Sequence, residues 1–191
     1  TGEREEHAQV RVAAASDPRE RVMVDLSKLQ SSHPQCHDVR QIYSIFSGMG
    51  LVYGPGHQAI EELATGQDDA GQRQVLAHLA LPQTVPQNHD HFGLHPSLLD
   101  GAFQAVLGMV LQDDGSEQTE TALPFALDSL ELLGPWEPHM WVHVRSAHTG
   151  RETGRVRKTD IDLIADDGTV RIRLRGFAVR MAAATKVRVD V

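Results

Sequence analysis

Residues 94–112, LHPSLLDGAFQAVLGMVLQ, constrain the fold most, because this run is apolar on nearly every side. Between Ser97 and Leu111 the only polar side chains are those of Ser97, Asp100 and Gln104. A helix with so little polar surface is covered on all sides by protein and does not lie on the surface. The sequence therefore predicts one buried helix that carries a carboxylate.

The carboxylate of Asp100 precedes the amide of Gln104 by four residues, so both lie on one face of the predicted helix. Pro96 suits the first helical position, where a missing N–H costs nothing. A carboxyl group in a dry site has a raised pKa and could donate a proton near neutral pH. A structural carboxylate, held by the backbone or by a basic side chain, fits the helix equally well.

Length, composition and charge exclude several classes of protein. The chain has 191 residues, 40% of them hydrophobic, which is enough for one domain with its own core. No run approaches the roughly 18 apolar residues of a membrane span, and the first residues lack signal-peptide character. The net charge of −8 disfavours a nucleic-acid partner. We therefore expect a cytoplasmic protein that binds neither membrane nor nucleic acid.

No pattern in the sequence is typical of a metal or cofactor site. The single cysteine, Cys36, has no partner for an internal disulfide or a CxxC pair. The eleven histidines include no HExxH pair. We expect this chain to bind no metal and no cofactor, and we interpret Cys36 as a structural thiol.

Extended runs separated by short loops dominate the rest of the chain. They cover residues 5–13, 58–63, 72–82, 121–135, 140–147 and 157–182, the last as a hairpin with its turn at Asp167 and Gly168 and a bulge at Gly176. A short amphipathic helix is expected after His37 or Asp38, and ends at Gly48 or Gly50. About six strands around one buried helix predict an α+β hotdog fold, in which an antiparallel sheet wraps the helix.

The loop YGPGH follows the short helix and offers a second candidate site. Gly54 and Gly56 flank Pro55, so the backbone can pass close to another molecule. Tyr53 adds a hydroxyl that can donate or accept a hydrogen bond. A purely structural turn is equally consistent with these residues.

Three motifs, GLVYGPGHQAI, GLHPSLLDGAFQ and ALPFALDSLEL, occur in this order. Together they resemble the second half of a dehydratase domain from a modular polyketide synthase, in the versions found in bacterial assembly lines with free-standing acyltransferases. The resemblance implies a double hotdog that removes water from a β-hydroxyacyl chain on the phosphopantetheine of an acyl carrier protein. The product would be an α,β-unsaturated thioester.

The resemblance also implies roles for particular residues. Asp100 matches the acid of the family and Gln104 its companion, while Tyr53 matches the tyrosine that helps to hold the substrate hydroxyl. Further residues of the three motifs would contact substrate: Gly54, Pro55, His57, His95, Pro96, Leu123, Pro124 and Phe125. Two departures, Leu51 in place of a tyrosine and His57 in place of a phenylalanine, affect substrate fit more than chemistry.

The family's histidine base lies in a pattern HxxxGxxxxP, which no histidine here satisfies. We therefore expect residues 1–13 to be the last strand of a first hotdog, 14–36 a linker, 37–184 the C-terminal hotdog and 185–191 the start of another linker. The base would come from the missing N-terminal hotdog or a partner chain, and a homodimer is a further arrangement to test. A non-catalytic scaffold or docking domain and a double-bond isomerase or cyclising relative are the alternatives.

Overall fold

The computed structural model describes residues 9–13, 21–86, 92–111, 121–147 and 156–182. Its helices are α1 (Leu26–Ser32), α2 (Val39–Gly48) and α3 (Pro96–Ala105), with 3-10 turns η1 (Pro55–His57) and η3 (Val106–Met109). Its strands are β1 (Gln35–His37), β2 (Ile60–Gln67), β3 (Arg73–Ala80), β4 (Thr121–Ala126), β5 (Ser129–Leu132), β6 (His139–Ser146), β7 (Val156–Ile164) and β8 (Val170–Ala182). None of these helices is long and apolar enough to cross a membrane.

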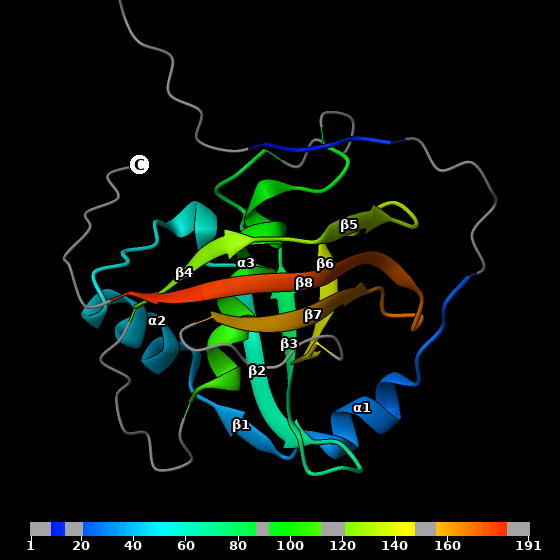
Figure 1. The fold of residues 1–191 in the computed structure, drawn as a ribbon, viewed down its shortest axis with the longest axis horizontal. Helices are drawn as coiled ribbons and strands as arrows, with labels where there is room; N and C mark the ends of the chain where they lie inside the picture. Colours follow the sequence, from blue (N-terminus) through cyan, green and yellow to red (C-terminus); the bar gives the residue numbers. More distant parts are fainter. Residues whose placement is uncertain (1–8, 14–20, 87–91, 112–120, 148–155, 183–191) are drawn as a thin grey trace, which may run out of the picture.

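The eight strands of the described chain form one curved sheet (Figure 1). The strand order is β1-β2-β3-β6-β7-β8-β4. Strand β5 also pairs with β8, along the same edge as β4. Every pairing is antiparallel. The sequence predicts about six strands. Two observed strands are additional: the three-residue β1, and β5, which follows β4 within a single predicted run.

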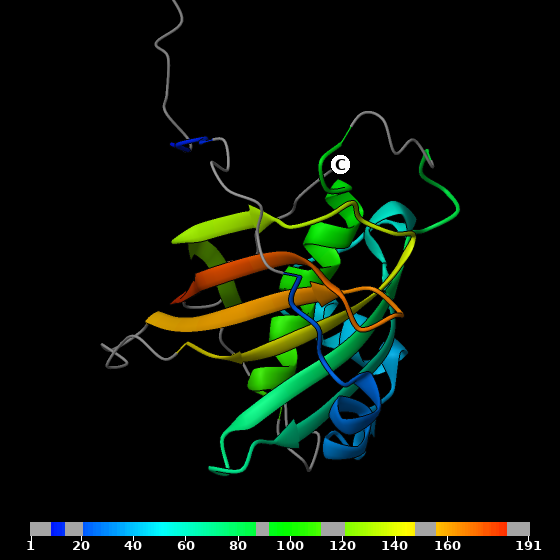
Figure 2. The same cartoon turned by 90° about the vertical axis from the view of Figure 1, so that its right-hand side faces the viewer.

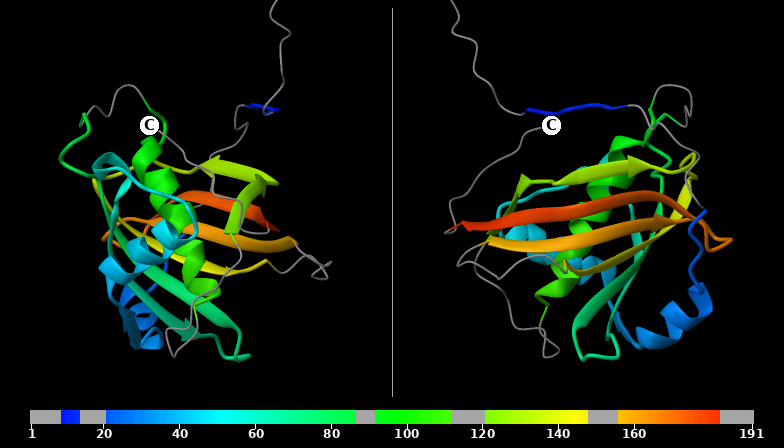
Figure 3. Two further views of the ribbon diagram at one scale, coloured as in Figure 1. Left: turned by 90° about the vertical axis from the view of Figure 1, so that its left-hand side faces the viewer. Right: turned by 45° about the vertical axis from the view of Figure 1, so that its right-hand side comes forward.

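Helix α3 lies along the inner face of this sheet, as the two side views show (Figures 2 and 3). Leu98, Ala102 and Ala105 have no exposed surface. Gly101 allows the closest approach, because a Cβ there would lie 3.0 Å from the Cβ of Ala59 and 3.2 Å from Leu79. The predicted hotdog fold is confirmed, and the apolar character of α3 follows from burial by the sheet on one side and by α2 on another.

Local chemistry places several elements where the sequence predicts them. Asp38 caps α2 by accepting a hydrogen bond from the backbone N–H of Arg40. Gly168 turns the β7-β8 hairpin with φ of 82°, and Gly176 has φ of 62° beside a register shift between the same strands. The LPF segment forms an edge strand with an irregular register between Pro124 and Ala126.

The predicted strand over residues 5–13 is wrong for its described part. Residues 9–13 form no strand, and Val10 and Val12 are 81% and 89% exposed. Residues 5–8 lie outside the described part of the chain. Alternating apolar residues form a strand only where a neighbouring strand takes up their backbone groups, and residues 9–13 have no such pairing.

The linker predicted over residues 14–36 contains ordered elements in its described part. Asp25 caps α1 by accepting a hydrogen bond from the N–H of Lys28, and β1 extends the sheet by pairing with β2. Gly66 admits the end of α1, because any Cβ there would collide with the carbonyl of Ser32. The segment is polar because it packs at the edge and outer face of the sheet, which periodicity alone does not distinguish from a linker.

A buried polar cluster joins the end of α1 to the outer face of the sheet. His143 on β6 bonds to the side-chain oxygen of Gln74 at 2.9 Å, and its ring meets that of His33 edge-on at 5.7 Å. Burial, followed by the positive charge of Arg145, lowers the pKa of His143 to about 4. The imidazole is therefore neutral at pH 7.

This depressed pKa predicts that the protein is less stable in acid. Because unfolded histidine titrates near 6.5, the unfolded state binds more protons between about pH 6.5 and 4, so stability is full above this window and is lost as pH falls through it. Replacing His143→Gln keeps a hydrogen-bond donor for Gln74 but removes the titration. Urea unfolding at about pH 7.5 and about pH 5 measures how much unfolding free energy is lost between them. The wild type should lose about 2 kcal/mol more than the variant. Equal losses would contradict the assignment.

Candidate active site

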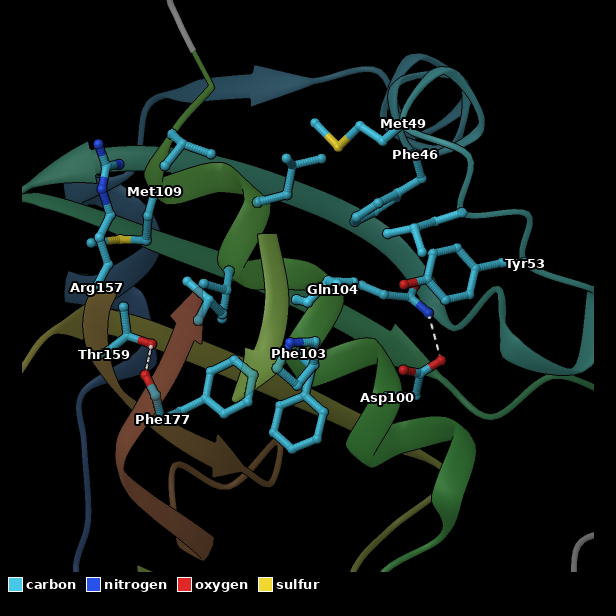
Figure 4. A pocket seen from close by; sticks show the side chains of 17 residues that line it. Phe46, Met49, Tyr53, Asp100, Phe103, Gln104, Met109, Arg157, Thr159 and Phe177 are labelled. Carbon is cyan, nitrogen blue, oxygen red and sulfur yellow. Dashed lines mark hydrogen bonds between the residues drawn. The ribbon is translucent and has the colours of Figure 1, made fainter. Parts of the chain in front are cut away.

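Asp100 lies one turn into α3, and its carboxylate is held by the amide of Gln104. The Gln104 Nε2 donates to Asp100 Oδ2 at 2.9 Å (Figure 4). It also donates to the backbone carbonyl of His57 at 2.9 Å. The four-residue spacing predicts the first of these bonds. The second ties α3 to the loop that carries the YGPGH motif.

His57 is the second partner of this carboxylate. Its Nδ1 lies 3.2 Å from Asp100 Oδ2, and the two side chains are 44% and 33% exposed. Burial raises the pKa of Asp100, while the hydrogen bonds and charge contributed by Gln104 and His57 oppose the rise without cancelling it. The site is wetter than the sequence predicts, yet the carboxyl still favours its protonated form more than a free aspartate does.

Tyr43 on α2 completes the polar network and was not among the predicted site residues. Its hydroxyl donates to Gln104 Oε1 at 3.1 Å and accepts the backbone N–H of Ile60 at 3.2 Å. Because Oε1 is engaged by Tyr43, the amide must present its NH₂ group to Asp100. Burial raises the pKa of Tyr43 to about 12, so it remains a donor. The signal in the sequence is a tyrosine on the apolar face of a helix, where its hydroxyl needs a partner.

Tyr53 lies beside the carboxylate and packs against two aromatic rings. Its ring contacts Phe46 and Tyr43 at centroid distances of 5.1 Å and 6.3 Å. Burial, and then the negative charge of Asp100, raise the pKa of Tyr53 well above its usual value. The hydroxyl is therefore a hydrogen-bond donor throughout the neutral range.

Asp100 stands where an inner cavity meets an outer groove. The inner cavity, about 120 Å³, has mainly apolar walls from α2, α3 and β8 (Figure 4). The outer groove, about 580 Å³, runs along the YGPGH loop and the start of α3. Four residues line both spaces: Leu51, Tyr53, Asp100 and Phe103. A chain entering by the groove would pass the carboxylate on its way to the cavity.

The other predicted contact residues divide between these spaces and the body of the protein. The groove is lined by Gly54, Pro55, His57 and Pro96, and the cavity by Leu123 and Pro124. His95 is instead buried, where its Nδ1 accepts the N–H of Ser97 and its ring meets that of Trp136.

Phe125 is not among the residues that line this cavity or this groove, so its predicted contact with substrate stays a prediction. The side chain is 59% exposed, and its ring lies 4.9 Å from the guanidinium carbon of Arg180. The register shift between Pro124 and Ala126 leaves Phe125 unpaired in the strand, which breaks the regular alternation of faces.

Asp100 and His57 offer two groups that could bind a metal ion. No third histidine, cysteine or carboxylate of the described residues joins them within ligand distance. The arrangement suits proton transfer: one carboxyl with a raised pKa, oriented by an amide, beside a tyrosine hydroxyl.

Known proteins are similar to this chain over most of its length. Residues 21–188 match the family described as polyketide synthase dehydratase N-terminal domain. Polyketide synthases PksM and PksN of Bacillus subtilis are 35% and 38% identical over 91% and 82% of this chain, which spans only 4% and 3% of their lengths.

Solved dehydratase structures show the same fold. The dehydratase domain of a trans-acyltransferase polyketide synthase from Brevibacillus brevis is 35% identical with a TM-score of 0.72, over 86% of this chain and 55% of that one. A CurK dehydratase variant is 25% identical with a TM-score of 0.74, over 88% of this chain and 56% of that one. The chain thus spans about half of the solved dehydratases it matches.

The contact between His57 and Asp100 predicts a change in the acid when the histidine is removed. Because the imidazole stabilises the carboxylate, His57→Phe should raise the pKa of Asp100 further. A ¹³C NMR titration of the carboxyl carbon measures the shift, with His37→Phe, on the distant β1, as control. A carboxyl that titrates at the wild-type pH or below it in His57→Phe would contradict the contact.

Proposed function

The chain belongs to the polyketide synthase dehydratase family, and from this premise we propose that it supplies the acid half of a dehydratase. The reaction is loss of water from a β-hydroxyacyl thioester on an acyl carrier protein in the cytoplasm, giving an α,β-unsaturated thioester. The observation that carries the proposal is the Asp100 carboxyl, with its raised pKa, at the junction of groove and cavity.

Dehydration needs two groups at two positions. A base removes the proton α to the thioester, while an acid protonates the β-hydroxyl as it leaves. A protonated Asp100 suits the second role, because burial disfavours its charged form. Gln104 keeps the carboxyl aimed, since Tyr43 and the carbonyl of His57 fix the amide itself.

The two spaces suggest how the substrate lies. The apolar cavity beyond Asp100 would accept the acyl chain, and the groove along Gly54 and Pro55 would accept the phosphopantetheine arm. The Tyr53 hydroxyl, on the wall shared by both, would bind the oxygen that leaves. In this orientation the β-carbon of the substrate would lie beside Asp100.

The base is proposed to come from the N-terminal hotdog, in the same polypeptide or in a partner. His57 faces the carboxylate oxygen of Asp100, so it shares the acid's position and does not take the separate place that the base needs. CurK dehydratase variants described as inactive carry a histidine-to-phenylalanine or an aspartate-to-asparagine change, which fits two essential groups in that relative. The half-length match to solved dehydratases agrees with one hotdog of a pair.

The assignment of the half rests on the motifs. The matching family is described as an N-terminal domain, whereas the pattern HPSLLDGAFQ supplies the aspartate that the resemblance places in the second hotdog. We propose that this chain is that second hotdog, and that Asp100 is one member of an Asp–His pair completed by the other.

Dehydration by the complete double hotdog tests the role of Asp100. A carrier-bound β-hydroxyacyl thioester is incubated with the domain, and loss of one water is followed by mass spectrometry. Asp100→Asn should lower the rate at least about a hundredfold, because general acid catalysis contributes 10²–10⁴-fold. Asp128→Asn is the matched control, since Asp128 pairs with Lys158 on the surface.

The outcomes separate the proposed functions. Unchanged turnover in Asp100→Asn would remove the acid assignment. No turnover by the complete wild-type domain would favour a scaffold or docking role, and a shifted or cyclic product from an enoyl or hydroxy-enoyl thioester would favour an isomerase or cyclising relative.

A further inference from the structure

Three potential metal ligands converge on the outer face of the sheet, away from Asp100. They are Glu61 on β2, His78 on β3 and His139 on β6, and their ligand atoms all lie within 4.8 Å of one another. The Nδ1 of His78 and the Oε2 of Glu61 are 3.3 Å apart. No sequence pattern reveals this cluster, because its members come from three strands.

The pairing of the strands brings these side chains together. His78 lies between the fully buried Ala77 and Leu79, so alternation turns its ring to the outer face. His139 is its diagonal neighbour, since Ala80 pairs with His139 and His78 with Trp141.

Glu61 reaches the cluster because of an irregularity in β2. Ile60 pairs with Leu79 and Glu62 with His78, so Glu61 is the extra residue of a bulge. A bulge re-aims a side chain that regular pairing would place elsewhere. Here the carboxylate is directed at the imidazole of His78.

We propose that Glu61, His78 and His139 form a binding site for one zinc-type divalent metal ion. Zinc binds histidine nitrogen and carboxylate oxygen at about 2.0–2.2 Å in a tetrahedron, which separates ligand atoms by about 3.3–3.6 Å. The Glu61–His78 separation already has this value. His139 is exposed, so rotation of its side chain can bring its nitrogen into the same range.

The surroundings suit a bound ion. A hollow beside the cluster, lined in part by Gln58, Glu61 and His139, leaves space for a water molecule as fourth ligand. The ring of Trp141 lies 4.7 Å from that of His78 and restricts its movement. Two imidazoles and one carboxylate favour zinc, nickel or copper over magnesium or calcium, which prefer sites made only of oxygen.

A metal held here would join three neighbouring strands. Its binding would stabilise the sheet by mass action, because the three ligands come together only in the folded chain. This site is independent of the proposed dehydration, since it lies on the other face of the sheet and uses none of the residues around Asp100.

Binding is tested with the tag-free, chelator-treated protein. Calorimetry with zinc should show one ion per chain, and zinc at about a hundred times the dissociation constant should raise the melting temperature by about 5–10 °C. Copper or nickel should quench the fluorescence of Trp141. The same metals should cause no such decrease in Trp141→Phe.

Variants identify the ligands. His139→Asn, Glu61→Gln and His78→Asn should each weaken zinc binding by at least about tenfold. Mutation of residues that only hydrogen-bond to a metal's ligands already lowers metal affinity about 10–100-fold, and these three residues are the ligands themselves. His57→Asn is the matched control: its imidazole also faces a carboxylate, but without a third ligand. His139 is exposed, so its variant tests the site even if the others unfold.

The outcomes are decisive in either direction. Binding of one zinc that is lost with His139 and retained without His57 supports the site. Absence of zinc binding, or a loss of equal size in His57→Asn, overturns it.

Discussion

The packing of α3 against the inner face of the sheet is the constraint on which the rest of the structure depends. At Gly101 the helix comes so close to Ala59 and Leu79 that no larger residue fits without a shift of its neighbours. This contact fixes the helix along its axis and in rotation, because a turn in either direction would drive Leu98 or Ala102 out of the core. The directions of Asp100 and Gln104 are consequences of that packing.

The polar network is ordered because one hydrogen bond in it fixes the orientation of the next. Tyr43 donates to Gln104 Oε1, so the NH₂ of the amide is left for Asp100 and for the carbonyl of His57. The network links α2, α3 and the YGPGH loop, and so it joins the acid to the loop that forms the groove. A preorganised site of this kind would need little reorganisation in the proposed proton transfer.

The sequence predicts what lies within one element and misses what lies between elements. The Asp100–Gln104 pair follows from helical spacing, and the turn at Gly168 follows from local chemistry. Tyr43 is 61 residues from Gln104, so its bond depends on how α2 packs. The cluster of Glu61, His78 and His139 depends on strand pairing and a bulge, neither of which leaves a periodic signal. Residues 21–36 look like a linker because their partners are distant in the chain.

The state of Asp100 follows from a balance that its surroundings control. Burial raises the pKa of the carboxyl, whereas Gln104 and His57 lower it, and the side chain is still 33% exposed. Covering that remaining surface with the proposed N-terminal hotdog would strengthen the effect of burial and leave both hydrogen bonds in place. A histidine brought in by the N-terminal hotdog would lower the pKa of Asp100 if it were protonated, and would affect it only weakly if it were neutral. A neutral base and a protonated acid are therefore the mutually compatible forms, and they are the forms from which the proposed dehydration would start.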